Sequence, residues 1–454
     1  MKKLAILGCF FLAITLFTAC DDDSVALPDL TVGFSSTQTN IAEDESSITV
    51  DLVFSRAVAE AGQIVLDVTE TGMAYGTDYT TFPAVLNGQI TLDVAVGASA
   101  AGVTLNKVRT SFDGEENLQF AINSLPTGLF TGQNTEITLN FTEVIASSST
   151  LDPTVGGATQ PNAVYVDLSA SKQIAVDRAS WDLGFYSVGN EFRVIINPHL
   201  SASTQAVDKT DLNEVGEPDS IGFAASMSFA AFNPAGAAWI DNPSGDISQT
   251  AITEISTTDA DNKVYILDRG TDADGNALGW KKIRILQSGG NYVLQHADIA
   301  ATTFTEVTIS KASAYNFTFF NFENGEVSVE PKKARWDIAF AVHTQYLNFG
   351  GGLIPYSLKD MVFQNRTGVT SIMLDEATYG AYENFVTADA AGITLSSNQI
   401  EIGGSWRDVF TVSVHDDRFY LVKDGDGNLF KLKFNRMALS GERGNPQFSY
   451  ELLD

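Results

Sequence analysis

Nucleophilic and metal-ligating side chains are scarce in this sequence. Cysteine occurs only at Cys9 and Cys20, so the remaining chain can form no disulfide, thiolate metal site or cysteine nucleophile. There are four histidines, His199, His296, His343 and His415. The sequence has no nucleophile elbow, zinc-binding His-Glu-x-x-His motif, Walker loop or dinucleotide-binding glycine pattern, and no carboxylate pair stands out from the many acidic residues. We therefore expect a protein that is not an enzyme.

The composition narrows the function further. The chain has 454 residues, of which 44% are hydrophobic, and its 27 basic against 56 acidic residues give a net charge of −29. The apolar content is typical of packed globular protein, and the length predicts about three domains. Neutralising nucleic-acid phosphates or anionic lipid requires clustered Lys and Arg. The charge thus argues against a nucleic-acid partner and suits an extracytoplasmic surface.

The first residues have the pattern of a lipoprotein signal. Lys2 and Lys3 precede an apolar run, Leu4–Phe17, that is too short to span a bilayer. The run ends in Phe-Thr-Ala-Cys20, which resembles a bacterial lipobox, and an ordinary secretory signal is the alternative. On this resemblance, residues 1–20 are a signal peptide and Cys20 carries the lipid. The acidic run Asp21–Asp23 resembles the export signal of surface-exposed lipoproteins in the Bacteroidetes, so we expect a lipid-anchored outer-membrane protein.

Residues 21–145 show short runs in which apolar and polar residues alternate, as at 47–54, 63–68, 89–94, 118–122 and 136–141. Such runs are typical of strands with one buried face, and their spacing predicts a β-sandwich. Acidic segments between the runs resemble those of Calx-β domains, which implies that Ca²⁺ can bind there. The implied ligands are Glu43, Asp44, Glu45, Asp78, Asp113, Glu115 and Glu116. The alternative is an acidic spacer without an ion.

Small and polar residues at 146–160 predict a linker, and the chain after it contains an internal repeat. Trp181-Asp-Leu-Gly-Phe185 recurs 155 residues later as Trp336-Asp-Ile-Ala-Phe340. An Asp-x-Asp-Gly-Asn segment also recurs, at 272–276 and 424–428, and it predicts a hairpin turn more strongly than a Ca²⁺ loop. We therefore predict two homologous modules, 161–310 and 311–454, and a mostly β fold for the whole chain.

The two modules resemble the HmuY family of haem-binding lipoproteins. The resemblance rests on the Trp-Asp motifs, on Glu191–Asn197 after the first of them, and on the closing hairpins that begin at Tyr265 and Tyr420. It implies a mostly β fold and a haem whose iron is held by two axial side chains, His or Met, after the Trp-Asp motif. Two axial ligands leave the iron no open position, which suits carriage rather than catalysis.

The resemblance makes His343 and Met373 the first candidate pair of haem ligands, with Met361 as the alternate partner. His199 and Met227 form a second candidate pair, but the two pairs do not align in the repeat, since Val188 matches His343. Each of these residues has a structural alternative, because Met is a common filler of cores and His199, which follows Pro198, can be a loop residue.

The function expected from the sequence is capture of haem from its source or from a haem-carrying protein, followed by delivery to an outer-membrane receptor. The rival is a non-enzymatic binding or adhesion lipoprotein that keeps the fold without haem ligation and binds a glycan, a protein or another small ligand.

Overall fold

The computed structural model describes residues 28–42, 45–109, 112, 114–143, 145–226 and 233–453. It is 47% strand and 9% helix, which confirms the predicted mostly β fold. Contacts divide the chain into two units, residues 1–109 with 116–141, and residues 110–115 with 142–454. No helix among the described residues is long and apolar enough to cross a membrane. Glu43, Asp44, Asp113, Met227 and the predicted lipid site Cys20 lie outside the described residues.

The first unit is a sandwich of two five-stranded sheets, with orders β5-β7-β3-β1-β9 and β2-β10-β8-β4-β6. The strands are β1 (Leu30–Phe34), β2 (Gln38–Ile41), β3 (Ser47–Phe54), β4 (Gly62–Thr71), β5 (Tyr79–Phe82), β6 (Gln89–Val94), β7 (Ala100–Lys107), β8 (Asn117–Ser124), β9 (Leu129–Thr131) and β10 (Glu136–Phe141). In β3 the apolar Val50, Leu52 and Phe54 are buried while the residues between them are exposed. The alternation seen in the sequence therefore places one face of each sheet in the core.

The second unit contains the repeat. β11 (Ser148–Leu151) lies in the predicted linker. The first copy supplies β12 (Asn162–Asp167), β13 (Lys172–Asp177), β14 (Leu183–Tyr186), β15 (Val194–Ile196), β16 (Ser203–Val207), α1 (Glu217–Ser226), β17 (Val264–Asp268), β18 (Trp280–Ser288), β19 (Asn291–Asp298) and β20 (Thr305–Ile309). The second copy supplies β21 (Phe317–Asn321), β22 (Gly325–Val327), β23 (Ile338–Asn348), β24 (Leu353–Gln364), β25 (Thr370–Asp375), α2 (Glu376–Tyr379), β26 (Arg407–Asp408), β27 (Ser413–Val414), β28 (Arg418–Lys423), β29 (Leu429–Leu439) and β30 (Glu442–Leu453).

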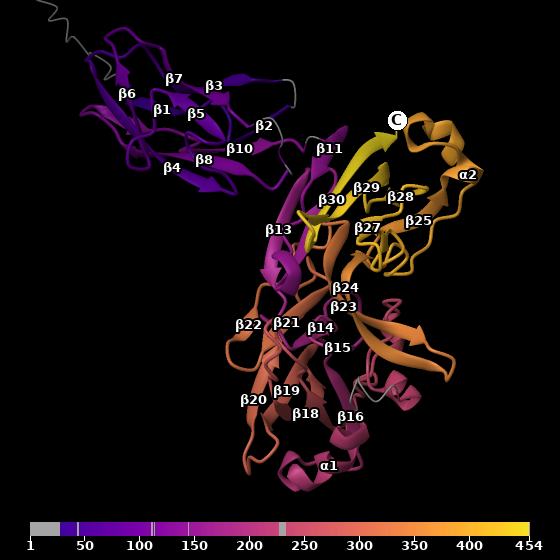
Figure 1. The fold of residues 1–454 in the computed structure, drawn as a ribbon. Helices are drawn as coiled ribbons and strands as arrows, with labels where there is room; N and C mark the ends of the chain where they lie inside the picture. The colour runs from indigo at the N-terminus through magenta and orange to yellow at the C-terminus, as the bar shows by residue number, and fades with distance from the viewer. Residues whose placement is uncertain are drawn as a thin grey trace, which may run out of the picture. The chain divides into compact units, whose positions relative to one another are not determined.

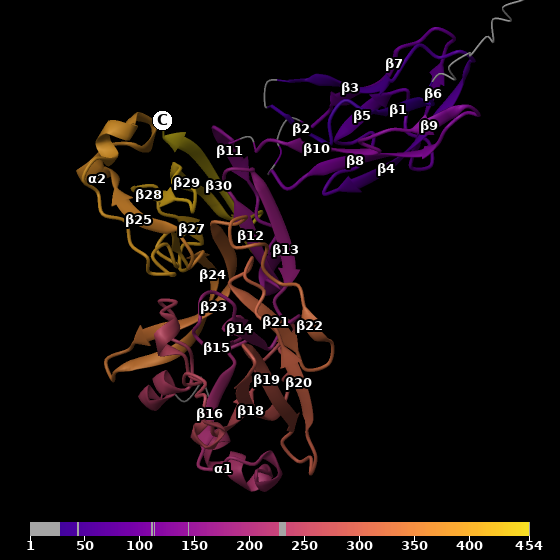
Figure 2. The ribbon, with the colours of Figure 1, turned by 180° about the vertical axis from the view of Figure 1, so that it is seen from behind.

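The two copies exchange their opening strands. β12 of the first copy pairs with β23 of the second, with Val164 opposite Phe340. Conversely, β21 of the second copy pairs with β14 of the first, with Phe320 opposite Leu183. The colours of Figures 1 and 2 show the exchange, because the early β12 and β13 lie beside the late β23 and β24. Neither copy therefore forms a closed sheet system by itself.

The hydrophobic cores follow the exchange. One core packs Val164 and Val166 of β12 against Phe340, Trp406 and other second-copy residues. The other packs Leu183 and Phe185 of β14 with Ile309 of the same copy and with the second-copy Phe320. A third cluster also combines residues of both copies and contains the tryptophans of both repeated motifs, Trp181 and Trp336. The repeated Trp-Asp motif thus anchors the point where the copies meet.

Candidate functional site

The two predicted ligand histidines, one from each copy, lie beside each other next to the cluster that contains Trp181 and Trp336. The ring centroids of His199 and His343 lie 5.5 Å apart, with the ring planes at 52°. Both rings stack on Phe363 of β24, each with a centroid distance of 5.4 Å. The two histidines are 3% and 5% exposed, respectively, so the pair is shielded from solvent.

Hydrogen bonds of the repeated motif place His199. Asn197, which follows β15, donates its side-chain amide to the carbonyls of Trp181 and Arg178 at 2.8 and 2.9 Å. The Asn197 side-chain oxygen in turn accepts from the backbone N–H of His199 at 2.9 Å. Thr344 of β23 donates both its backbone N–H and its hydroxyl to the Pro198 carbonyl. The first-copy loop that carries His199 is thereby tied to the second-copy strand that carries His343.

The tautomer of His199 follows from its partner. The Nδ1 atom lies 2.7 Å from the Val342 carbonyl oxygen, which can only accept a hydrogen bond, so Nδ1 carries the proton. Nε2 is then the nitrogen with a free lone pair, in the arrangement that orients histidine as a metal ligand. In His343, by contrast, Nδ1 has no hydrogen-bond partner among the described residues.

Burial keeps both imidazoles neutral. It lowers the pKa of His199 to about 4, partly opposed by the hydrogen bond to Val342. Burial also lowers the pKa of His343 well below its usual value, and His199 and Arg366 lower it further. Neutral imidazole is the form that binds a metal.

Two opposite charges lie in the same chamber as the histidines. Arg366 donates to the Gly245 carbonyl at 2.7 Å and to the Gln399 side-chain oxygen at 3.0 Å. Glu330 accepts from the backbone N–H groups of Asn316 and Phe317 at 2.8 and 3.0 Å. Burial raises the pKa of Glu330 to about 7 and lowers that of Arg366. The chamber is thus lined by charged as well as aromatic side chains.

The space left in the chamber is small. The cavity lined by both histidines, both motif tryptophans and Phe363 has a volume of about 50 Å³. Pockets for small-molecule ligands and cofactors occupy roughly 300–1,000 Å³. The chamber therefore holds two imidazole donors, but in this closed form it does not accommodate a porphyrin.

The predicted methionine partners have other neighbours. The thioether of Met361 on β24 accepts from Arg407, and that of Met373 on β25 accepts from Arg418, each at 3.8 Å. Met373 packs at the edge of the core around Trp406. The structure thus pairs His343 with His199 rather than bringing either methionine to it. His296 packs against Phe320 and Phe322 at centroid distances of 5.5 and 5.2 Å.

Predicted Ca²⁺ ligands of the first unit have partners in the protein. Arg109 forms ion pairs with both Asp78 and Glu116. Glu45 accepts from the backbone N–H of Ala42 at 2.9 Å. Among the described residues, no group of three or more His, Cys, Asp or Glu side chains is arranged to hold a metal ion. This holds for the described predicted ligands, Glu115 included.

The histidine pair predicts a pH effect on stability. Unfolded His199 binds a proton below its usual pKa of about 6.5, whereas the folded chain binds one only near pH 4, so acid favours the unfolded state. The stabilisation from neutral His199 is complete above pH 6.5 and falls by at most about 3 kcal/mol as the pH drops to 4.

Glu330 acts in the opposite direction. The pKa of its carboxyl is raised when the chain folds, so its contribution is complete below its usual pKa of about 4.5 and is lost as the pH rises through 7. The test must therefore compare His199→Gln with the wild type by urea unfolding from pH 4 to 7.5. We expect the stability difference to shrink toward pH 4 in this variant, with His415→Gln as control. A pH-independent difference would contradict the neutral, buried His199.

Comparison with known proteins gives one family and several distant structures. The model of the HmuY protein family matches residues 159–305 and 313–450, and no curated protein matches the chain. The apo form of the Calx CBD1 domain covers 25% of this chain and 96% of its own, at 11% identity and a TM-score of 0.22. A two-domain Bacteroides fragilis protein of unknown function covers 66% and 91%, at 10% identity and a TM-score of 0.20.

The structure of a putative carbohydrate-binding protein from Bacteroides ovatus covers 93% of this chain and 98% of its own, at 10% identity and a TM-score of 0.19. TM-scores this low support no inference about function. The family match is of a different kind, because it spans both copies of the repeat and more than half of the chain. The chain therefore belongs to the HmuY family.

Proposed function

We propose that this protein binds haem at the cell surface and passes it to an outer-membrane uptake receptor. The observation that supports this function best is the meeting of His199 and His343, one from each copy, as two neutral imidazoles in one chamber. Each imidazole would supply one nitrogen to the haem iron, and an iron held by two side chains would have no open position for catalysis.

Haem binding on this proposal requires the chamber to open. Phe363 stacks on both imidazole rings and a volume of about 50 Å³ remains, so the ring of Phe363 must leave before a macrocycle enters. The energy of opening lowers the apparent affinity, because only the open fraction of molecules binds. The same opening gives a route for release to the next carrier.

The proposal includes the location of the protein in the cell. The lipobox-like segment that ends at Cys20 and the acidic residues after it favour a lipid anchor in the outer membrane, with the modules at the cell surface. Membership of the HmuY family supports the same location.

A haemin titration of the mature chain in detergent, followed by absorbance, tests the function. We expect a saturable Soret shift, and we expect His199→Ala and His343→Ala each to weaken haemin binding about tenfold or more, because each removes one axial ligand. His415→Ala serves as the matched control. An unchanged shift in the double variant of His199 and His343 would place haem elsewhere, and the absence of any shift would reject haem binding.

The closed chamber favours one alternative, a binding or adhesion lipoprotein that keeps the fold without haem ligation. In that case Phe363 and both histidines are simply part of the packed hydrophobic core, and the chamber does not open. This alternative predicts no Soret shift together with binding to a polysaccharide or to cells.

A further inference from the structure

The aspartates of the two repeated Trp-Asp motifs have opposite electrostatic surroundings. In the first copy, Asp182 is 3% exposed and accepts two hydrogen bonds from the guanidinium of Arg269, at 2.7 and 3.1 Å. The same guanidinium donates to both carboxylate oxygens of Glu323, each at 2.7 Å. A buried cation therefore lies between two carboxylates, with Arg269 following directly after strand β17.

In the second copy, the residue directly after the matching strand β28 is acidic, Asp424. The matching motif aspartate, Asp337, is 6% exposed, and its Oδ2 atom accepts from the backbone N–H of Leu168 at 2.8 Å. Asp337 has no ion pair with any residue in the described ranges, and its Oδ1 atom has no hydrogen-bond partner there. Asp424 holds the same turn position as Asp272, so three residues that separate β17 from its turn, Arg269 among them, have no counterpart after β28. The second copy has thus kept the buried carboxylate without its cation.

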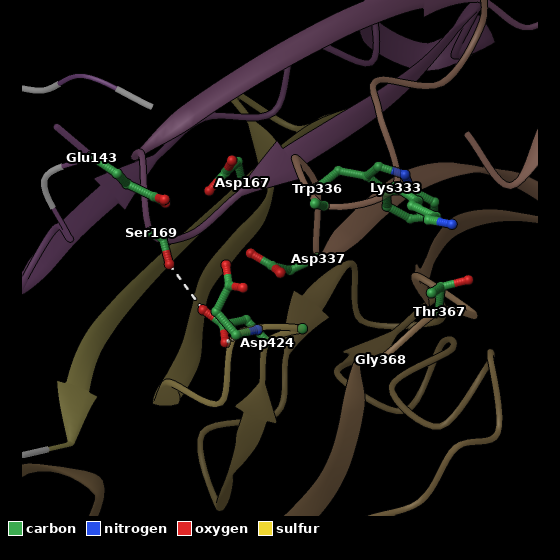
Figure 3. A pocket seen from close by; sticks show the side chains of 12 residues that line it. Glu143, Asp167, Ser169, Lys333, Trp336, Asp337, Thr367, Gly368 and Asp424 are labelled. Carbon is green, nitrogen blue, oxygen red and sulfur yellow. Dashed lines mark hydrogen bonds between the residues drawn. The ribbon is translucent and has the colours of Figure 1, made fainter. Parts of the chain in front are cut away.

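A pocket lies beside Asp337. Asp337, Asp167 and Asp424 point toward one another across it, and Asp426 and Glu143 also line it (Figure 3). Its volume is about 150 Å³, several times the roughly 30 Å³ of one water and smaller than the pocket of a whole drug-sized ligand. The pocket therefore has room for the head group of a ligand.

The cations near the pocket do not neutralise Asp337. Lys333 lies across the pocket from Asp167 in Figure 3 and forms no ion pair with a described residue. Arg335 pairs with Glu143 at 3.0 Å. Burial, followed by the charges of Asp167, Asp424 and Asp426, raises the pKa of Asp337 well above its usual range.

We propose that this acidic pocket binds the guanidinium group of a ligand, in the place that Arg269 fills for Asp182 in the other copy. A metal ion fits the pocket less well, because the carboxylates are not grouped closely enough to hold one among the described residues. A planar guanidinium with five N–H donors can span carboxylates that are farther apart. The pocket and the histidine chamber share Trp336 as a lining residue, but none of the pocket's carboxylates lines the chamber, and the proposal does not depend on haem binding.

Calorimetric titration of the full mature chain with methylguanidinium tests the proposal. We expect saturable binding, and binding at least tenfold weaker for methylammonium, which lacks the planar array of donors. A capped Gly-Arg-Gly peptide and its lysine counterpart distinguish the source of the group. Tighter binding of the arginine peptide than of methylguanidinium would indicate an arginine side chain of a partner, and the reverse a free small molecule.

Two variants locate the binding. Asp337→Asn preserves the shape of the side chain and its acceptor for Leu168, and we expect it to weaken methylguanidinium binding at least tenfold. Asp426→Asn at the exposed rim carries little risk to folding, and its matched control is Asp274→Asn in the same loop position of the first copy. Methylguanidinium binding that is unchanged in both pocket variants would overturn the proposal. Ca²⁺ binding that guanidinium does not compete with would also overturn it, as would the absence of saturable binding because Asp337 holds a proton.

Discussion

Replacing Arg269 with alanine is expected to lower the free energy of unfolding by about 3–5 kcal/mol. Arg269 is 7% exposed and makes four hydrogen bonds to the carboxylates of Asp182 and Glu323. Its removal leaves the buried Asp182 carboxylate without a cation, and the cost of an uncompensated buried charge exceeds the value of the pair itself. Urea unfolding at pH 7 measures the loss.

Two further variants show whether the charge is the cause. Lys263 pairs with Asp208 at 2.9 Å, but the two side chains are 42% and 97% exposed, so Lys263→Ala should change stability by about 1 kcal/mol or less. Combining Arg269→Met with Asp182→Leu removes both charges and should recover most of the stability that Arg269→Ala loses. Equal effects of Arg269→Ala and Lys263→Ala would show that the buried pair has no special weight.

Replacing Phe340 with alanine is expected to cost about 3–5 kcal/mol, because the cavity lies in a core shared by both copies. Phe340 is 1% exposed, lies opposite Val164 of the first copy, and stacks on Phe448 with a centroid distance of 5.5 Å. The loss should appear as a lower urea midpoint of the single transition of the second unit.

The control for Phe340→Ala is Phe410→Ala, since Phe410 is 94% exposed and its truncation should change stability by no more than about 0.5 kcal/mol. The slope of the unfolding free energy against urea should stay the same in both variants. A Phe340→Ala transition that splits into two would contradict the shared core, because it would show that the copies unfold separately.

Local patterns in the sequence predicted the elements well. The alternating runs at 47–54, 89–94 and 136–141 are strands with those bounds. The Asp-x-Asp-Gly-Asn segments form the predicted turns, in which Asp272 and Asp424 each accept from the backbone of the asparagine four residues later. These features depend on neighbouring residues, so the sequence alone contains the information that determines them.

Contacts between the copies were not predictable in the same way. The sequence suggested ligand pairs within one copy, because nothing in a linear repeat indicates that β12 pairs with β23. The loops after the two Trp-Asp motifs do share one feature, because the side-chain amides of Asn197 and Asn365 donate equivalent hydrogen bonds to the carbonyls of Trp181 and Trp336. Their separation of 168 residues departs from the repeat offset of 155, which hides the match of His199 with Thr367.

The exchanged opening strands also bear on how such a molecule assembles. A single copy would lack the strands that pair with β12 and β14. Two separate chains of one copy each could supply these strands to each other as a strand-swapped homodimer. In this protein both halves belong to one polypeptide, so the exchange is intramolecular and its effective concentration is set by the connecting chain. Dilution therefore cannot dissociate the two halves, and the histidine pair where they meet is preserved at any protein concentration.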